Sequence, residues 1–305
     1  MSVPAPHARG ATLLRCPVCA GGLRMADRSL VCDQRHTFDV ARHGHVTLLR
    51  GAPPTGDDAE MVAARAAVFD AGHYAPLTRA LAAAAGETRG GGKGRGDAAS
   101  AGAAAERVVL DLGAGTGHHL AGVLDALPGA LGIALDTSRP ALRHAARAHA
   151  DIAAIVADVW APLPLRDDTV DLVLDVFSPR NAAEMARVLR PGGTALVVIP
   201  TPEHLAELSE LHGVHVDPAK VERLERTVGA HLELAGREAV RWTMELDAED
   251  VERVLEMSPA GAHRREGVTP RAATVSGSVE LWTFRSPDVG GRAGLWPGDL
   301  ADDGG

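Results

Sequence analysis

The chain has 305 residues, of which 46% are hydrophobic, with 31 Lys and Arg against 40 Asp and Glu. This length suits one large domain with a small one, or two of medium size. No apolar run reaches the roughly 18 residues of a membrane span, and residues 1–10 lack the apolar stretch of a secretory signal, so we expect a soluble cytoplasmic protein. The net charge of −9 argues against nucleic-acid binding by the whole surface, because phosphate neutralisation needs clustered Lys and Arg.

Positive charge is concentrated near the N-terminus. Residues 1–50 carry seven Arg and three Asp, a sum of +4, which leaves −13 for residues 51–305. Residues 1–50 therefore form a small basic module, and its arginines either bind a partner or are merely solvated.

The next segment is predicted to be helical. Residues 51–56 have the composition of a linker, and Asp57 or Asp58 can cap a helix that runs to Phe69. A second helix is predicted over residues 74–85. Residues 86–106 are a Gly- and Ala-rich low-complexity stretch, which we expect to be a flexible insertion.

From residue 107 onward, short aliphatic strands alternate with helical stretches. The strands are predicted at residues 108–112, 130–135, 152–157, 170–176 and 194–199. This alternation predicts an α/β fold, a parallel sheet with helices on both faces. Residues 232–246 and 275–285 can add a hairpin-like pair at the far edge, and residues 286–305 are expected to be a disordered tail.

The three cysteines and one histidine of the basic module have the spacing of a zinc site. Cys16 and Cys19 form one close pair, and Cys32 and His36 form the other. Two such pairs on tight turns provide the four ligands of a tetrahedral Zn²⁺ ion. Because four protein ligands leave no open position for water, we expect the metal to stabilise the fold of this ribbon rather than to catalyse a reaction.

A glycine-rich turn follows the first predicted strand. Gly113, Gly115 and Gly117 stand in a Gly-x-Gly-x-Gly pattern at the start of a helix, where a ligand can approach the backbone closely. The dinucleotide fingerprint would place a small residue where the chain has His118, and the Gly-Lys-Ser/Thr of a phosphate-binding loop is absent. The pattern fits the Rossmann-like sheet of S-adenosylmethionine methyltransferases.

Carboxylates fall at the ends of successive predicted strands. Asp111 lies in the first strand, Asp136 closes the second and Asp158 the third. Asp136 can accept hydrogen bonds from ribose hydroxyls, and Asp158 from an adenine amino group. The alternative is that these residues cap helices.

The loop after the fourth strand faces the expected position of the transferred methyl group. Methyl transfer to nitrogen requires alignment and loss of any proton on the acceptor. Asp175 is a candidate base, Phe177 can stack on a flat acceptor, and Asn181 or Arg180 can bond its edge. Asp175 and Phe177 are also compatible with purely structural roles.

Several motifs together resemble those of the 23S ribosomal RNA guanine-N1 methyltransferases, over residues 13–285. They are CPVC with CDQRHTFDVARHGHV (16–46), FDAGHY (69–74), VLDLGAGTG (109–117), VFSPRN (176–181) and LRPGG (189–193). Residues 58–66 (DAEMVAARA), GHHL (117–120) and ADVW (157–160) look closest to the actinobacterial branch linked to tylosin and mycinamicin resistance.

This resemblance implies methylation of a guanine in the hairpin 35 loop of 23S rRNA. It implies zinc on the four ribbon residues and cofactor contacts from Tyr74, Gly115, Thr116 and His204. It also implies a homodimer whose ribbons help to line an RNA cleft. The expected domains are a zinc ribbon for RNA recognition (1–50) and a methyltransferase domain (57–285).

Two other functions remain open from the sequence. A small-molecule methyltransferase could use the ribbon only for self-association. A non-catalytic RNA-binding or ribosome-assembly factor could retain the fold without binding S-adenosylmethionine.

Overall fold

The computed structural model describes residues 5–51, 56–88, 106–209, 220–257 and 269–288. Most of the predicted linker (51–56), insertion (86–106) and tail (286–305) lies outside these ranges. Helix α3 (Ala75–Glu87) continues two residues beyond its predicted end, into the expected insertion. None of the described helices is both long and apolar enough to cross a membrane.

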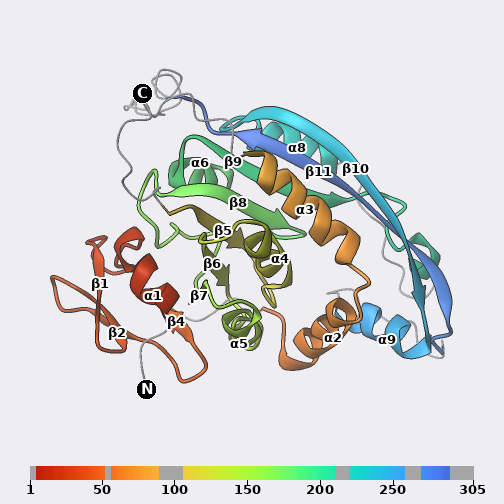
Figure 1. The fold of residues 1–305 in the computed structure, drawn as a ribbon, viewed down its shortest axis with the longest axis horizontal. Helices are drawn as coiled ribbons and strands as arrows, with labels where there is room; N and C mark the ends of the chain where they lie inside the picture. Colours follow the sequence, from red (N-terminus) through yellow and green to blue (C-terminus); the bar gives the residue numbers. More distant parts are fainter. Residues whose placement is uncertain (1–4, 52–55, 89–105, 210–219, 258–268, 289–305) are drawn as a thin grey trace, which may run out of the picture.

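The centre of the molecule is an eight-stranded sheet (Figure 1). Its strand order is β10-β11-β9-β8-β5-β6-β7-β4. The strands are β4 (His45–Thr47), β5 (Val108–Leu112), β6 (Leu131–Asp136), β7 (Ile152–Val156), β8 (Val170–Val176), β9 (Leu189–Pro200), β10 (Glu233–Leu246) and β11 (Ala273–Arg285). The run from β4 to β9 is parallel, and β11 and β10 are added antiparallel. This arrangement confirms the predicted Rossmann-like sheet and its edge pair.

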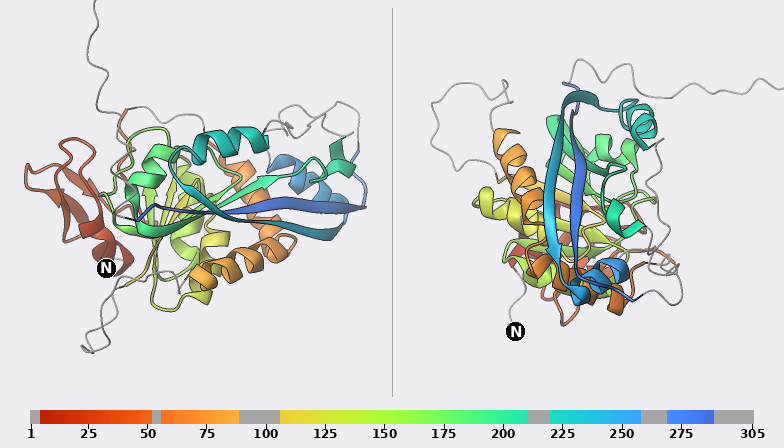
Figure 2. Two further views of the ribbon diagram at one scale, coloured as in Figure 1. Left: turned by 90° about the horizontal axis from the view of Figure 1, so that it is seen from above. Right: turned by 90° about the vertical axis from the view of Figure 1, so that its right-hand side faces the viewer.

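Figure 2 shows β10 and β11 as one long antiparallel ribbon along the side of the molecule. Strand β9 is longer than predicted, because it begins at Leu189 rather than at residue 194. Its register with β8 shifts between Val170 and Leu172, and Gly192 in the added part has a φ of 72°. The extra residues therefore follow a bulged path, which the alternation of side chains could not predict.

Helices cover one face of the sheet. This layer contains α3, α4 (His118–Ala126) and α5 (Arg139–Ala148), with α2 (Ala59–Asp70) and α9 (Ala248–Glu256) beside it (Figure 1). The predicted start of α2 is confirmed, because the Asp58 side chain accepts hydrogen bonds from the backbone amides of Glu60 and Met61. Such a cap satisfies amides that have no partner inside the helix.

The opposite face is covered by α6 (Ala182–Val188), α8 (Lys220–Val228) and the N-terminal ribbon. The ribbon comprises α1 (Ala5–Gly10), a 3₁₀ turn η1 (Ala11–Leu13) and a three-stranded sheet of β1 (Leu23–Ala26), β2 (Ser29–Cys32) and β3 (Thr37–Asp39). Its buried residues, Cys16, Leu30 and Cys32 among them, belong to the same core cluster as Leu110 and Ile133 of the large sheet.

The ribbon takes the place of a crossover helix. The connection from β7 to β8, residues 157–169, is described throughout and contains no helix. Leu14 forms a bridge with Leu165, and the Arg15 amide donates to the Pro164 carbonyl (3.1 Å). Strand β4 then pairs with β7 at the sheet edge. The basic N-terminal segment therefore contributes to the core and to the sheet of the large domain.

Candidate metal and cofactor sites

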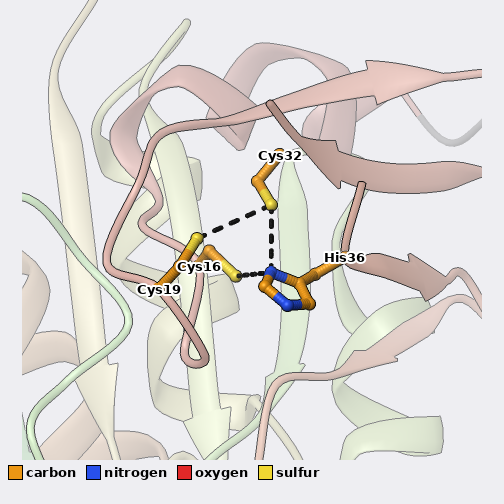
Figure 3. Close-up of side chains that lie close together, drawn as sticks. All are labelled: Cys16, Cys19, Cys32 and His36. Atoms are coloured by element: carbon orange, nitrogen blue, oxygen red, sulfur yellow. Dashed lines mark hydrogen bonds between the residues drawn. The ribbon is translucent and has the colours of Figure 1, made fainter. Parts of the chain in front are cut away.

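The four predicted zinc ligands converge on one point (Figure 3). Their ligand atoms all lie within 4.8 Å of one another. The His36 Nδ1 atom is 3.6 Å from Cys16 Sγ and 3.3 Å from Cys32 Sγ, and the Cys19 and Cys32 sulfurs are 3.7 Å apart. A tetrahedral Zn²⁺ ion with ordinary bond lengths requires sulfur–sulfur edges of about 3.8 Å and sulfur–nitrogen edges of about 3.6 Å. The cluster therefore fits one zinc ion, with His36 binding through Nδ1.

Two tight turns bring these ligands together. In the first, the Cys16 amide donates to Gly21 O (2.7 Å) and the Ala20 amide donates to Cys16 O (2.8 Å). In the second, the Arg35 amide donates to Cys32 O (2.9 Å). Ala20 and Arg35 have φ angles of 58° and 64°, a left-handed conformation that tightens each turn.

The arginines of the basic module divide into two groups. Arg9 pairs with Glu106 and Asp151, Arg15 donates to the Leu163 carbonyl and Arg28 to the Val40 carbonyl, so these three hold the ribbon to itself or to the domain. The other four are exposed. They are Arg24, Arg35, Arg42 and Arg50. Of the seven arginines in the basic module, these four are therefore the ones exposed to a binding partner.

The glycine turn joins β5 to α4 as predicted. Gly113, Gly115 and Gly117 have φ angles of 66°, 54° and 76°, which side-chain-bearing residues rarely adopt. A Cβ atom on Gly113 would overlap the Ser178 hydroxyl, and one on Gly117 would come within 2.9 Å of Ala145 Cα. The turn therefore needs glycine both for its conformation and for close packing. Thr116, inside the turn, is 6% exposed, and its Oγ1 atom has no partner among the described residues.

Two of the predicted carboxylates flank this turn. Asp136 Oδ2 accepts from the Gly115 amide and Oδ1 from the Ser138 amide, both at 2.8 Å. Burial raises the pKa of Asp111 well above its usual range, and the nearby Asp136 and Asp175 carboxylates raise it further. A cation would relieve this repulsion. S-adenosylmethionine carries a sulfonium and an ammonium group, so the acidic cluster fits this cofactor.

Asp158 is placed differently from the other two acids. Its Oδ1 atom accepts from the Trp160 amide (2.9 Å) and so shapes the loop after β7. Trp160 itself is 66% exposed. Asp158 therefore caps a turn and not a helix, which was the alternative considered from the sequence, and its adenine contact stays a prediction.

Aromatic rings from distant segments meet beside the glycine turn. Tyr74 is edge-on to Phe177, His204 and Trp242, with ring centroids 5.6 to 6.4 Å apart. Phe177 stacks on His204 at 5.5 Å, remains 40% exposed and has a φ of 55°. This left-handed backbone turns the ring out of β8, which leaves one aromatic face available to a flat acceptor.

His204 is electrically neutral at physiological pH. Burial, with a smaller contribution from the charge of Lys220, lowers the pKa of His204 to about 4. Its Nδ1 atom accepts from the Ser278 amide (3.2 Å), so the ring proton resides on Nε2, which lies 3.4 Å from the Tyr74 hydroxyl. The pair thus has a defined direction of hydrogen bonding, from His204 to Tyr74.

Asp175 is fully buried at the end of β8. Burial raises its pKa to about 7, against the opposing effect of Arg180. Arg180 Nε lies 3.2 Å from Asp175 Oδ1, within ion-pair range but without hydrogen-bond alignment. The structure therefore gives Asp175 a contact with Arg180 and no exposed surface of its own, and its role as the base stays a prediction.

Asn181 has a structural contact at each end of its side-chain amide, and its predicted contact with the acceptor stays a prediction. Its Oδ1 atom accepts from the Glu184 amide (3.4 Å) and caps α6, while Nδ2 donates to the Val159 carbonyl (3.1 Å). Both ends of the amide are occupied, so Asn181 ties α6 to the loop that carries Asp158. Its sequence position next to Arg180 did not distinguish a cap from a binding residue, since Asn serves both purposes.

The structure adds residues that the sequence did not single out. Arg65 of α2 pairs with Asp57 and donates to the Met257 carbonyl (2.6 Å), beside Gly115. His118 stacks on Phe69 with centroids 4.6 Å apart. A cavity of about 190 Å³ adjoins the glycine turn, and its lining consists of Ala66, Phe69, Asp70, Thr116, His118, His144, Arg147 and Ala148. Several of these side chains belong to motifs quoted from the sequence, but their meeting in one cavity depends on helix packing.

Comparisons with known proteins agree with both sites. A zinc-ribbon model described as "RlmA, N-terminal" matches residues 14–50, and one described as "Methyltransferase domain" matches residues 109–193. The chain is 49% identical over 255 residues to the "23S rRNA (guanine(748)-N(1))-methyltransferase" of Streptomyces fradiae, covering 82% of this chain and 86% of that protein.

Two further relatives extend the match. A "Putative 23S rRNA (guanine-N(1)-)-methyltransferase" of Micromonospora griseorubida is 47% identical over 89% of this chain and 97% of its own length. The Bacillus subtilis (strain 168) protein "Putative 23S rRNA (guanine-N(1)-)-methyltransferase YxjB" is 31% identical over 81% of this chain and 86% of its own. The chain therefore belongs to the family of S-adenosylmethionine-dependent 23S rRNA (guanine-N1)-methyltransferases, with a zinc ribbon at its N-terminus.

Proposed function

We propose that this protein transfers a methyl group from S-adenosylmethionine to N1 of guanine 748, in the hairpin 35 loop of 23S rRNA, and so confers resistance to tylosin- and mycinamicin-type macrolides. The observation that carries the proposal is the 49% identity to the Streptomyces fradiae enzyme over 82% of this chain and 86% of that protein. The 31% identity to the Bacillus subtilis protein is much lower. This difference favours the substrate of the Streptomyces relative.

The cofactor is proposed to lie along the glycine turn. Gly115 and Thr116 would border its methionine end, Asp111 would face its positive charge, and Tyr74 and His204 would close over it. Asp136 would receive the ribose hydroxyls, and Asp158 the adenine. When bound, S-adenosylmethionine supplies an electrophilic methyl group on a positively charged sulfur.

The acceptor guanine is proposed to stack on the exposed face of Phe177. Guanine N1 carries a proton at neutral pH, and its loss places negative charge on O6. Arg180 follows Phe177 by three residues, and its side chain is 21% exposed. Its guanidinium group could donate to O6, while Asp175 holds it in place. The N1–carbon bond forms as the sulfur–carbon bond breaks, and the N1 proton leaves to solvent.

The zinc ribbon is proposed to position the RNA. Arg24 and Arg35 are exposed near the metal site, and arginine is well suited to phosphate contacts. We further propose that the enzyme acts in the cytoplasm as a homodimer, in which two ribbons border one RNA cleft. Light scattering on the purified protein would measure the mass of the assembly, and a monomer at working concentration would contradict the dimer.

The proposed reaction can be tested on defined RNA. An unmodified hairpin 35 transcript would be incubated with methyl-labelled S-adenosylmethionine and digested, and the nucleosides identified by mass spectrometry. We expect N1-methylguanosine at position 748, and no label in a transcript with adenine at that position. Label on another nucleotide, or none on RNA, would overturn the proposal and favour a small-molecule methyltransferase or an assembly factor.

A further inference from the structure

Three arginines form a row along the exposed side of α5. Arg139, Arg143 and Arg147 are all exposed and follow one another at intervals of four residues. Four helical residues advance the chain by about 6 Å, so these side chains project from one face. The opposite face packs on β6 and β7 through Ala141, Leu142 and Ala145. The row therefore faces solvent at the side of the sheet that ends in β4 (Figure 1).

These three arginines are not paired with acids among the described residues. In the described parts of the structure, no ion pair joins any of the three arginines to a carboxylate. By contrast, Arg187 of α6 and Arg253 of α9 pair with acids three or four residues away. Like charges at this spacing weaken a helix, and Arg139 also opposes the dipole at the helix N-terminus. The three arginines therefore weaken α5, and stabilisation of the fold does not explain their presence.

The loop before β4 extends the row with two more basic side chains. Arg42 Nη2 lies 3.3 Å from His43 Nε2, and Arg147 Nη2 lies 3.1 Å from His43 Nδ1. A neutral imidazole has one acceptor nitrogen, so it can accept from only one of these guanidinium groups. Desolvation and the charges of Arg42, Arg143 and Arg147 lower the pKa of His43. Three basic groups thus converge where an anion would be favoured.

Asp70 of α2 lines the same cavity as Arg147 and His144, but it forms no ion pair with either of them in the described structure. Asp70 therefore does not neutralise the row of Arg139, Arg143 and Arg147 through an ion pair.

The row begins next to Asp136, where the cofactor is proposed to bind, and follows α5 away from that site. Arg139 follows the Ser138 cap, whose backbone amide donates to Asp136. Arg147 and the loop containing Arg42 lie at the other end of α5, beside the start of β4. An RNA whose target base lies at the proposed cofactor site can therefore extend along the arginine row on α5.

We propose that Arg42, Arg139, Arg143 and Arg147 bind backbone phosphates of the rRNA outside the modified loop. This inference rests on the proposed function, since it takes RNA as the substrate. Guanidinium groups bind phosphate oxygens in a bidentate manner, and such contacts fix the position of an RNA without reading its sequence. The surface adds affinity for RNA that extends beyond the minimal hairpin.

The test compares two RNAs and two double variants. The variant Arg42→Gln with Arg143→Gln removes two of these four arginines, both exposed and outside the cavity beside the glycine turn. Its matched control, Arg79→Gln with Arg226→Gln, removes the same charge from exposed positions on α3 and α8. Binding to the minimal hairpin and to a longer fragment with the flanking helices is measured by fluorescence anisotropy at 50 and 200 mM salt. Thermal unfolding of each variant confirms that it is folded.

We expect the row variant to bind and methylate the minimal hairpin like the control, but to bind the longer fragment more weakly. Loss of two phosphate contacts should lower the slope of log affinity against log salt by about two. The affinity advantage of the wild type should then shrink about tenfold between the two salt concentrations. Equal affinities and slopes for variant and control on the longer fragment would overturn the inference. Failure of the wild type to methylate either RNA would instead contradict the proposed function.

Discussion

Tyr74 and His204 are separated by 130 residues in the chain, yet the Tyr74 hydroxyl lies 3.4 Å from His204 Nε2 at the cofactor edge. Because the Ser278 amide occupies His204 Nδ1, His204 donates to the tyrosine oxygen. Tyr74 is then free to donate its own proton to a ligand. Burial raises the pKa of Tyr74, so the hydroxyl keeps that proton at every working pH.

Replacement of Tyr74 by Phe should weaken cofactor binding while leaving the fold intact. One lost hydrogen bond is worth about 1 kcal/mol, which corresponds to about fivefold in affinity. Isothermal calorimetry with S-adenosylhomocysteine measures this change. Since the pKa of His204 is about 4, the wild-type affinity should not change through the protonation of His204 between pH 6 and 8. An affinity transition near pH 6.5 that disappears in His204→Gln would contradict the neutral assignment.

The tight packing of the glycine turn predicts an unequal effect of two alanine substitutions. Gly113 and Gly129 both have positive φ angles, 66° and 81°, but a Cβ atom at position 113 would overlap Ser178, whereas position 129 has nothing within 4 Å. Gly113→Ala should therefore lose about 1–3 kcal/mol more stability than Gly129→Ala and should abolish cofactor binding. Chemical denaturation and calorimetry give the two quantities. If both variants lose the same stability, backbone strain alone explains the need for glycine at position 113.

The shared core predicts that zinc stabilises the whole molecule. Cys16 and Cys32 belong to the same buried cluster as Leu110 and Ile133 of the large sheet, and β4 pairs with β7. Removal of zinc by a chelator, or Cys16→Ser, should lower the melting temperature of the single unfolding transition and weaken cofactor binding indirectly. Differential scanning calorimetry distinguishes the alternative. A separate low-temperature transition, with the main one unmoved, would show that the ribbon unfolds independently.

The sequence predicted those features that depend on local spacing. The positions of Cys16, Cys19, Cys32 and His36 were sufficient for the metal cluster, and the glycine pattern with its preceding strand was sufficient for the turn. These signals are strong because a tetrahedral site and a left-handed turn each admit few residue types.

Features created by packing between distant segments were not predictable from the residues alone. The pairing of His45–Thr47 with β7 depends on a short strand that has no distinctive pattern. Arg65 meets the carbonyl of Met257, which lies 192 residues away. The position of Tyr74 beside His204 was expected only from the resemblance to a family. The contacts of Asn181 with the Glu184 amide and the Val159 carbonyl likewise appear only in three dimensions.

The burial of Asp175 predicts a pH-dependent effect on stability. Its folded pKa is about 7, against an ordinary value of 3.8, so the native state keeps a proton that the unfolded state has lost between these values. Stability from this group therefore falls as pH rises through that window, and the penalty is complete above pH 7. Asp175→Asn should raise the melting temperature relative to the wild type more at pH 8 than at pH 5. An equal difference at both values would mean that Asp175 is ionised throughout.

The same substitution distinguishes two catalytic roles. If Asp175 acts only by holding Arg180 against the acceptor, Asp175→Asn should slow methyl transfer by about a hundredfold above pH 7, where the wild-type carboxylate is ionised, and much less at pH 5. In an Arg180→Ala background the same substitution should then have no further effect at any pH, because no guanidinium group is left to hold. If Asp175 removes the N1 proton itself, the single-turnover rate should still rise through about pH 7 in that background, and Asp175→Asn should abolish the rise. Arg180→Lys is the companion variant, because it keeps the charge but loses the planar geometry. We expect it to reproduce most of the loss, and a fully active Arg180→Lys enzyme would contradict a directed contact from Arg180 to O6.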